Sequence, residues 1–245
     1  MHDRLLLLNG ALNFRDLGGY ATTGGDVIRW GRLFRSDALY ALTPGDLVIL
    51  RSLDIATVID LRKQDEIAYT GRGLLAHSPI TLIETDVLNE QLPMPSPAAF
   101  VDEGTLHDVY WRYLTSGSVN FVRALQELAR PETYPTVVSC FFGKDRTGVL
   151  IALVLSCLGV ERDAIVEDYV LSASRMHHLI ERLRDDPVYS ETLERTPMWR
   201  LASTPVTMTT FLVKLDEQFG DARSWALRAG VTPTQLENLS AALTT

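Results

Sequence analysis

A cysteine and an arginine stand six positions apart within residues 136–159, which read TVVSCFFGKDRTGVLIALVLSCLG. Cys140 ends an apolar run, and Arg146 is followed by a second, longer apolar segment. An ionised thiol is a strong nucleophile, and a guanidinium pairs two oxygens of a tetrahedral anion through its planar fork. We therefore expect both side chains to act on one phosphate group.

The residues around this pair predict a strand, a loop and a helix. Residues 136–140 resemble a buried strand, and residues 145–158 predict a helix. A loop of this kind lies at the carboxyl edge of an α/β sheet, where its N–H groups and those of the first helical turn form an anion site. Gly143 allows the tight turn that this requires. The residues expected to line the phosphate site are Phe141, Phe142, Gly143, Lys144 and Thr147.

The chemistry expected from this loop is hydrolysis of a phosphate monoester. Arg146 and the helix N-terminus favour the thiolate of Cys140, which attacks phosphorus in line with the leaving oxygen. Water then hydrolyses the phosphocysteine, and a hydroxyl donated by Thr147 would help the sulfur to leave. The leaving oxygen needs a proton from a carboxylic acid. Asp145 is the first candidate for that acid, and the alternatives are Asp16, Asp60 and Asp86.

A longer sequence pattern is more specific for a phosphate-binding loop than a short one. Cysteine and arginine at this spacing arise often by chance, and the plain alternative is a buried cysteine with a surface arginine. The longer pattern C-x-x-G-K-D-R-T-G, between a strand and a helix, is much more specific. A Walker-type phosphate loop is excluded because Val138 stands where that loop needs a glycine.

Composition fits one large globular domain or two small ones, and we expect a single domain spanning residues 1–245. The chain is 46% hydrophobic and carries a formal net charge of −8, which argues against general binding of nucleic acid or anionic membranes. Two cysteines form no disulfide framework, so a reducing compartment is expected and Cys157 is predicted to pack in the core. No metal site or cofactor is expected, because the adjacent His177 and His178 should point to different sides of a helix.

No targeting or membrane segment is predicted. The beginning of the sequence lacks the pattern of a signal peptide, and the longest apolar run, residues 149–160, has 12 residues. A membrane-spanning helix needs about 20. We therefore expect a cytoplasmic protein.

Strand and helix patterns alternate, which favours an α/β fold with a mostly parallel central sheet flanked by helices. Strands are expected early in the chain and at 55–62, 80–85 and 136–140, with a possible flap or lid at about 89–115. A helix should begin at Pro44 behind the N-cap Thr43. Further helices are expected at 106–115, 118–130, 145–158, 161–174 and 174–186, and two more in the tail, one ending near Gly220 and one capped by Thr232 and Gln235.

The loop resembles the signature H-C-x-x-G-K-D-R-T-G of a bacterial tyrosine-phosphatase family with atypical dual or triple specificity. The segments NFRDLGGY at 13–20, VIDLR at 58–62, GVERDAIVEDYVLS at 159–172 and FLVKLDEQFG at 211–220 match as well. The resemblance implies a cysteine-phosphatase fold with extra lid-like and C-terminal helices. It also implies metal-free hydrolysis of phosphotyrosine, often accompanied by activity on phosphoserine, phosphothreonine or phosphoinositides.

Carried over by position, the resemblance makes Cys140 the nucleophile, Arg146 the phosphate clamp, Lys144 a second positive charge for a substrate phosphate, and Asp145 the acid/base. The sequence departs from the family pattern at Ser139, where histidine is usual, and at Phe142, where alanine is usual. The histidine helps to keep the thiolate ionised, so lower activity is expected. Phe142 either narrows the mouth of the site or packs on a neighbouring loop.

Two charged pairs at probable strand ends have alternative roles. Arg15 or Arg62 would contact substrate, or both would form ion pairs with Asp16 and Asp60 that brace the loop. The leading function is a protein-tyrosine phosphatase acting on phosphotyrosine proteins or peptides, with phosphate as product. The alternatives are a phosphoinositide or dual-specificity phosphatase, and a weakly active pseudophosphatase that only binds phosphate.

Overall fold

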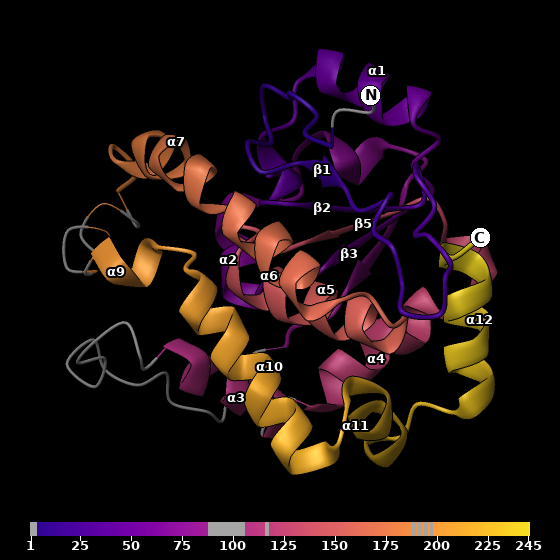
Figure 1. The fold of residues 1–245 in the computed structure, drawn as a ribbon. Helices are drawn as coiled ribbons and strands as arrows, with labels where there is room; N and C mark the ends of the chain where they lie inside the picture. The colour runs from indigo at the N-terminus through magenta and orange to yellow at the C-terminus, as the bar shows by residue number, and fades with distance from the viewer. Residues whose placement is uncertain are drawn as a thin grey trace.

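The computed structural model describes residues 4–87, 106–115, 118–187 and 198–245, together with 190, 193 and 196. Its central sheet has five strands in the order β1 (Arg15–Asp16), β2 (Leu33–Ser36), β5 (Thr136–Ser139), β3 (Thr57–Asp60) and β4 (Thr81–Glu84) (Figure 1). β1 pairs antiparallel with β2, and all other neighbours are parallel. The predicted mostly parallel sheet is confirmed.

Neighbouring residues on the strands face opposite sides of the sheet, as alternation along a strand requires. Phe34, Val58 and Val137 pack on one side with Leu50 of α1 (Pro44–Ser52) and with the 3₁₀ segments η1 (Leu39–Ala41) and η2 (Gly73–His77). The residues next to them on the same strands, Leu33, Ile59 and Val138, join a larger core on the other side. The sheet therefore separates two apolar layers.

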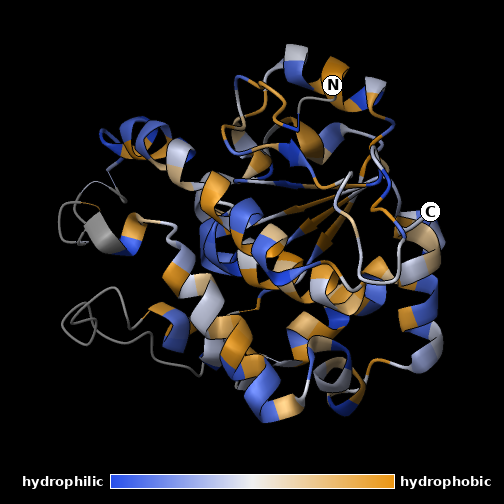
Figure 2. Ribbon diagram, in the orientation of Figure 1, coloured by the Kyte–Doolittle hydropathy of each residue, from blue (hydrophilic) through white to orange (hydrophobic). Residues whose placement is uncertain are grey.

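The larger layer is built from helices. They are α3 (Leu106–Thr115), α4 (Ser118–Leu128), α5 (Asp145–Cys157), α6 (Arg162–Leu171), α10 (Pro205–Phe219), α11 (Ala222–Ala229) and α12 (Pro233–Leu243). The remaining elements are α2 (Gln64–Thr70), α7 (Ala173–Leu183), α9 (Met198–Leu201) and η5 (Pro131–Thr133). Figure 2 shows hydrophobic colours on the central strands and hydrophilic ones on the outer turns of the flanking helices.

Helix α5 is the element that positions the loop after Cys140. Every residue from Arg146 to Leu155 is buried. A helix that is apolar on all sides is stable only inside a protein, so α5 lies between the sheet and the surrounding helices, with α3, α4, α6 and α11 against it. The first turn of α5 is therefore a rigid support.

Most predicted helices are confirmed, including the N-cap Thr43 and the capping box of Thr232 with Gln235. The two predicted tail helices are present as α10 and α12, and α11 between Gly220 and Gly230 was not predicted. Only eight residues long, α11 has Asp221 as its N-cap, whose carboxylate accepts a hydrogen bond from Ser224 N. The short helix α2 was also not predicted, since Ile67 is its only buried residue.

Residues 106–115 of the expected flap form α3, which buries Leu106, Val109, Tyr110, Tyr113 and Leu114 in the larger core. The rest of that segment, residues 89–105, lies outside the described residues. Within the described part of the chain, none of the helices combines the length and hydrophobicity of a membrane span.

Candidate active site

The loop after β5 crosses the carboxyl end of the parallel strands, between β2 and β3. Cys140 is only 2% exposed and is a free cysteine, as is Cys157, which packs against the larger core. Burial raises the pKa of the Cys157 thiol to about 12, so this cysteine stays protonated at neutral pH. Cys140 is the cysteine that the fold brings to the ligand-binding edge of the sheet.

Gly143 gives the loop its tight turn. Its φ is +65°, in the left-handed region. A Cβ at this position would lie 2.4 Å from the carbonyl carbon and oxygen of Ser36, so any side chain would meet fixed backbone. The loop can wrap closely only because this residue is glycine.

Two buried side chains fix the direction of the loop's peptide groups. Asn13 Nδ2 donates to the carbonyl oxygens of Phe142, at 3.1 Å, and Gly143, at 3.3 Å. Arg35 Nη2 donates to the same Gly143 oxygen at 2.7 Å. In a planar trans peptide the N–H points opposite to the carbonyl. The N–H groups of Gly143 and Lys144 therefore point away from Asn13 and Arg35, as donors to a bound anion would.

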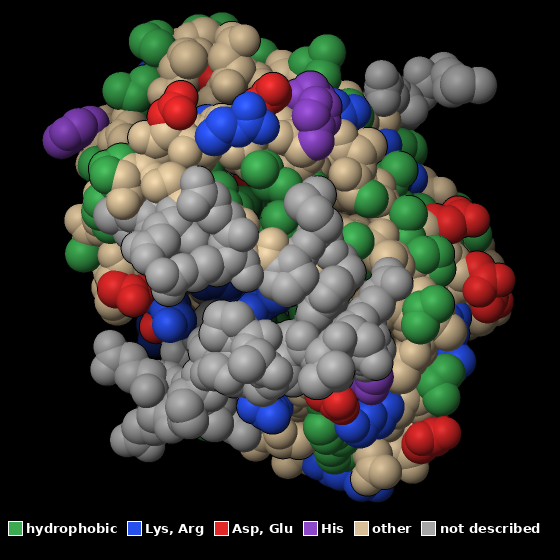
Figure 3. Space-filling view, turned by 90° about the vertical axis from the view of Figure 1, so that its left-hand side faces the viewer, with side chains coloured by type: hydrophobic (Ala, Val, Ile, Leu, Met, Phe, Trp, Pro, Cys, Tyr) green, Lys and Arg blue, Asp and Glu red, His purple; other side chains and the backbone are tan. Residues whose placement is uncertain are grey.

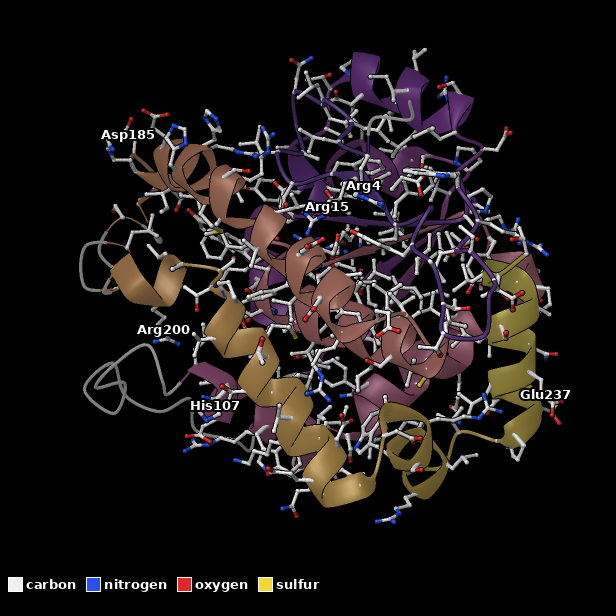
Figure 4. All side chains as sticks on the ribbon, viewed as in Figure 1. Arg4, Arg15, His107, Asp185, Arg200 and Glu237 are labelled. Carbon is white, nitrogen blue, oxygen red and sulfur yellow. The ribbon has the colours of Figure 1, made fainter. Side chains whose placement is uncertain are left out.

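Asp168 of α6 holds this support together. Its carboxylate accepts from Arg15 Nε at 2.9 Å and from Arg35 Nη1 at 2.6 Å, and all three residues are 1% exposed. Figure 4 shows Arg15 in the interior, beside the sheet and α6. Burial acts against the carboxylate, but the two guanidinium groups outweigh it and hold the pKa of Asp168 at about 2. The ion pairs thus persist at neutral pH.

Arg146 is held by Glu66 of α2. Nη1 lies 2.5 Å from Glu66 Oε2 and 3.2 Å from the Leu61 oxygen, and Nη2 lies 2.8 Å from Glu66 Oε1. Burial opposes the charge on Arg146, yet Glu66 and, more weakly, Cys140 raise its pKa well above the ordinary value. Cys140 directly follows β5 and Arg146 lies in the first turn of α5, so the two residues stand at the two ends of one short loop.

Lys144 is placed differently from the expectation. Its ammonium group donates to the carbonyl oxygens of Arg200, at 2.6 Å, and Ala202, at 3.0 Å, and lies 3.2 Å from Asp145 Oδ1. The side chain is 1% exposed, and a buried ammonium needs such partners. Arg200, labelled in Figure 4, lies in the last turn of α9, shortly before α10. Lys144 therefore links the α9–α10 connection to the loop.

Asp145 is the first residue of α5, and its side chain is 26% exposed. Its Oδ1 atom accepts a hydrogen bond from the hydroxyl of Tyr110 at 2.5 Å. A carboxyl group in this position can exchange a proton with a molecule that enters the loop.

The remaining loop residues have different surroundings. Thr147 Oγ1 is buried and has no hydrogen-bond partner among the described residues, so its hydroxyl remains available. Phe142 packs against a small cluster of Met176, Leu179 and Leu201, with Phe141 edge-on at 5.1 Å. Of the two alternatives for Phe142, the structure thus favours packing on a neighbouring segment. Ser139, at the end of β5, is 1% exposed.

The charged pairs near the strand ends serve the framework. Arg62 pairs with Asp60, Nη2 to Oδ2 at 2.7 Å, as one alternative expected. Arg15, however, pairs with Asp168 and not with Asp16, because Asp16 accepts hydrogen bonds from the backbone N–H groups of Gly18 and Gly31, both at 2.7 Å. These contacts engage the carboxylates of Asp16 and Asp60, two of the alternative acids, in the framework.

The structure corrects the expectation for the paired histidines. The rings of His177 and His178 do not point to different sides of α7, since their centroids are 3.7 Å apart. Together with Glu181 they bring three possible ligand atoms within 4.8 Å of one another, and all three residues are exposed. Figure 3 shows the face that carries α7, with histidine beside acidic and basic side chains.

Sequence reasoning missed several residues that hold the site. Glu66, Tyr110 and Asp168 come from segments far from the loop in the chain. Asp168 lies within the matched segment 159–172, which gave some indication of its importance. Nothing in the sequence around Glu66 indicates that it binds Arg146.

Sheet, loop and side chains define an enzyme of the cysteine–arginine phosphate-loop class. A model of the tyrosine phosphatase family matches residues 6–245. The chain therefore belongs to the tyrosine phosphatase family.

Three relatives carry phosphatase names. The triple specificity protein phosphatase PtpB of Mycobacterium tuberculosis is 32% identical over 82% of this chain and 79% of its own length. A putative tyrosine-protein phosphatase of Cupriavidus necator is 31% identical over 66% of this chain and 61% of that protein. A tyrosine-protein phosphatase of Nostoc commune is 32% identical over 62% of this chain and 50% of that protein.

Solved structures give weaker matches. The Siw14 catalytic core superposes with a TM-score of 0.40 at 16% identity, covering 80% of this chain and 98% of that one. The P. aeruginosa protein TpbA in complex with pTyr gives a TM-score of 0.30 at 18% identity, covering 69% and 89%. The fold assignment rests on the sheet described above and on the family match.

Proposed function

We propose that the protein is a protein-tyrosine phosphatase that works through a phosphocysteine on Cys140. The observation that carries this proposal is the loop from Cys140 to Arg146, whose carbonyl groups are bound on its outer side by Asn13 and Arg35. Family membership supports the same reaction class. Since the match spans 6–245, we also infer that the chain forms one catalytic domain.

In the first step, loop N–H groups and Arg146 bind the phosphate oxygens, and Sγ of Cys140 attacks phosphorus. A sulfur–phosphorus bond forms as the bond between phosphorus and the leaving oxygen breaks. Asp145 gives its proton to that oxygen, so that tyrosine leaves as a neutral phenol.

In the second step, water takes the place of the phenol. The Asp145 carboxylate accepts a proton as the water oxygen bonds to phosphorus, and the sulfur–phosphorus bond breaks. The Thr147 hydroxyl, which has no partner among the described residues, donates to the departing thiolate. Inorganic phosphate leaves, and the protonated Asp145 and ionised Cys140 are restored.

The depth of the sulfur favours phosphotyrosine. Cys140 is 2% exposed, so a substrate must carry its phosphate on a long side chain, and phosphotyrosine is longer than phosphoserine or phosphothreonine. A preference for phosphoinositides would call for a second free cation, but the ammonium of Lys144 already meets two carbonyl groups and Asp145. Because one relative is named a triple specificity protein phosphatase, phosphotyrosine, phosphoserine and phosphoinositide substrates should be compared.

The test compares kcat/KM for a phosphotyrosine peptide, the matching phosphoserine peptide, a phosphoinositide and an aryl phosphate. We expect the phosphotyrosine peptide and the aryl phosphate to react fastest, and Cys140→Ser to be inactive on every substrate. Acid quenching during turnover should trap phosphate on Cys140. A higher kcat/KM for the phosphoinositide would overturn the substrate assignment, and activity in Cys140→Ser would overturn the mechanism. Phosphopeptide binding without turnover would identify a pseudophosphatase.

A further inference from the structure

A chain of two buried hydroxyl groups ends on the proposed acid. Tyr110 OH lies 2.5 Å from Asp145 Oδ1, and Tyr169 OH lies 2.7 Å from Tyr110 OH. The three residues come from different helices, α3, α5 and α6. Tyr110 is fully buried and Tyr169 is 1% exposed, so the bond between the two hydroxyl groups is shielded from solvent, while the Asp145 end of the chain is partly exposed.

The direction of the two hydrogen bonds follows from counting protons. An ionised carboxylate only accepts, so Tyr110 donates its single proton to Asp145. Tyr169 must then donate to the Tyr110 oxygen. Burial and the nearby Asp145 raise the pKa of Tyr110 well above its ordinary value, which keeps this donor protonated throughout the pH range of catalysis.

The surroundings of Asp145 distinguish its two oxygens. Tyr110 OH and the Lys144 ammonium both face Oδ1, the latter at 3.2 Å. A proton on Oδ1 would compete with a hydrogen-bond donor and a cation. When Asp145 is protonated, the proton is therefore better placed on Oδ2.

The ring of Tyr110 has little freedom to move. It packs edge-on against Tyr169 and Phe211, with both centroid distances 6.2 Å, and is stacked on Tyr113 at 5.9 Å. A donor on so fixed a ring sets the angle of the carboxyl group that it binds, in the way that an oriented partner fixes a catalytic histidine.

We propose that Tyr110 is a positioning residue for acid catalysis: it holds Oδ1 of Asp145, with Tyr169 behind it, so that Oδ2 presents the proton to the leaving oxygen. This inference rests on the proposed function and adds to it the oxygen that reacts and the side chains that select it. Tyr110 acts on the reaction only through Asp145.

Leaving groups of different basicity separate this role from a structural one. Phenyl phosphate needs a proton for its leaving oxygen, whereas 2,4-dinitrophenyl phosphate leaves as a stable anion. The parameter to compare is kcat/KM, because it reports only the steps up to cleavage of the first phosphorus–oxygen bond. General acid catalysis contributes about 10²–10⁴-fold, so we expect Tyr110→Phe to lose roughly 10-fold on phenyl phosphate and less than about 2-fold on the dinitrophenyl ester.

Further variants complete the test. Asp145→Asn should show the same pattern with a larger loss, and Tyr169→Phe the same pattern with a smaller one. In the Asp145→Asn background, Tyr110→Phe should cause no additional loss, because residues acting through one group are not additive. Tyr134→Phe is the matched control: it removes a buried hydroxyl that donates to the Leu128 oxygen at 2.6 Å, so it should lower stability and leave both rates unchanged.

Three results would overturn the inference: equal losses on both esters in Tyr110→Phe, unchanged rates on both, or a full additional loss in the Asp145→Asn background. A failure of Asp145→Asn to distinguish the two esters would also overturn it, while leaving the phosphocysteine mechanism intact. A different result would contradict the proposed function itself: phosphatase activity that remains in the Cys140→Ser variant.

Discussion

The carboxylate of Glu66 accepts hydrogen bonds from both terminal nitrogens of Arg146, with Nη1 2.5 Å from Oε2 and Nη2 2.8 Å from Oε1. Burial acts against the charge on Glu66, but Arg146 outweighs it and holds the pKa of Glu66 below its ordinary value. The bidentate pair fixes the plane of the guanidinium before any phosphate arrives.

The first prediction concerns this pair. Glu66→Ala should free the guanidinium, raising KM and lowering kcat so that kcat/KM falls by about 100-fold, the loss that small misplacement of a catalytic group causes. Steady-state kinetics on an aryl phosphate give both parameters. Glu84→Ala is the matched control, since Glu84 pairs with the exposed Arg72 in the same two-pronged manner and should change activity little. Equal effects of the two variants would contradict a special role for Glu66.

The second prediction concerns Gly143. Gly143→Ala should lower kcat/KM by at least about 100-fold and weaken vanadate binding, because the new methyl group meets the backbone of Ser36 and displaces the loop donors. Gly25→Ala provides the control: Gly25 has φ +92° but open space around it, so the variant should lose about 1–2 kcal/mol of stability and keep its activity. Retained vanadate binding in Gly143→Ala would show that the loop tolerates a side chain.

The third prediction concerns Lys144. Lys144→Met should release the carbonyl groups of Arg200 and Ala202, so hydrogen exchange at residues 200–204 should become faster. Activity on a singly phosphorylated aryl substrate should fall by less than about 10-fold, since the side chain does not act on that phosphate. Unchanged exchange together with a selective loss on doubly phosphorylated substrates would instead make Lys144 a substrate ligand.

The fourth prediction concerns the pH dependence of stability. Burial outweighs the Arg182 ion pair and raises the pKa of Asp37 to about 6. With a folded pKa above the unfolded one, the folded state holds the proton more tightly, and the resulting stability is present at low pH and lost as pH rises through about 6.

Urea unfolding of the wild type and Asp37→Asn at several pH values isolates this contribution. The free energy of unfolding of the wild type should fall relative to that of the variant by on the order of 2 kcal/mol between pH 4 and 7. Parallel pH curves for the two proteins would contradict the raised pKa. Arg182 donates to both Asp37 and the Gly10 oxygen, so Arg182 itself should be left unchanged in this comparison.

The features that could be predicted from the sequence are those that depend on residues close together in the chain. The loop from Cys140 to Thr147 is a local pattern between a strand and a helix, so its place and its turn at Gly143 could be foreseen. The helices capped by Thr43 and Thr232 were foreseen for the same reason. Short helices such as α2 and α11 bury few residues and leave little periodicity to detect.

The partners of the loop could not be foreseen in this way. Glu66, Tyr110 and Asp168 reach Arg146, Asp145 and Arg35 only because α2, α3 and α6 pack around the sheet. Arg15 illustrates the difficulty: Asp16 is next to it in sequence, but successive strand residues point in opposite directions, and its ion pair forms with α6. The position of Lys144 in the loop likewise does not reveal the carbonyl groups of Arg200 and Ala202 that surround its ammonium group.

The hydrogen bonds from Asn13 and Arg35 to the loop carbonyls have a consequence for turnover. They fix the peptide groups with their N–H donors on the side away from Asn13 and Arg35, so the donors are preorganised for a phosphate group. The same donors suit the phosphate of a substrate and the inorganic phosphate that is released. Inorganic phosphate should therefore compete with substrate, and its accumulation would slow the enzyme without any separate regulatory site.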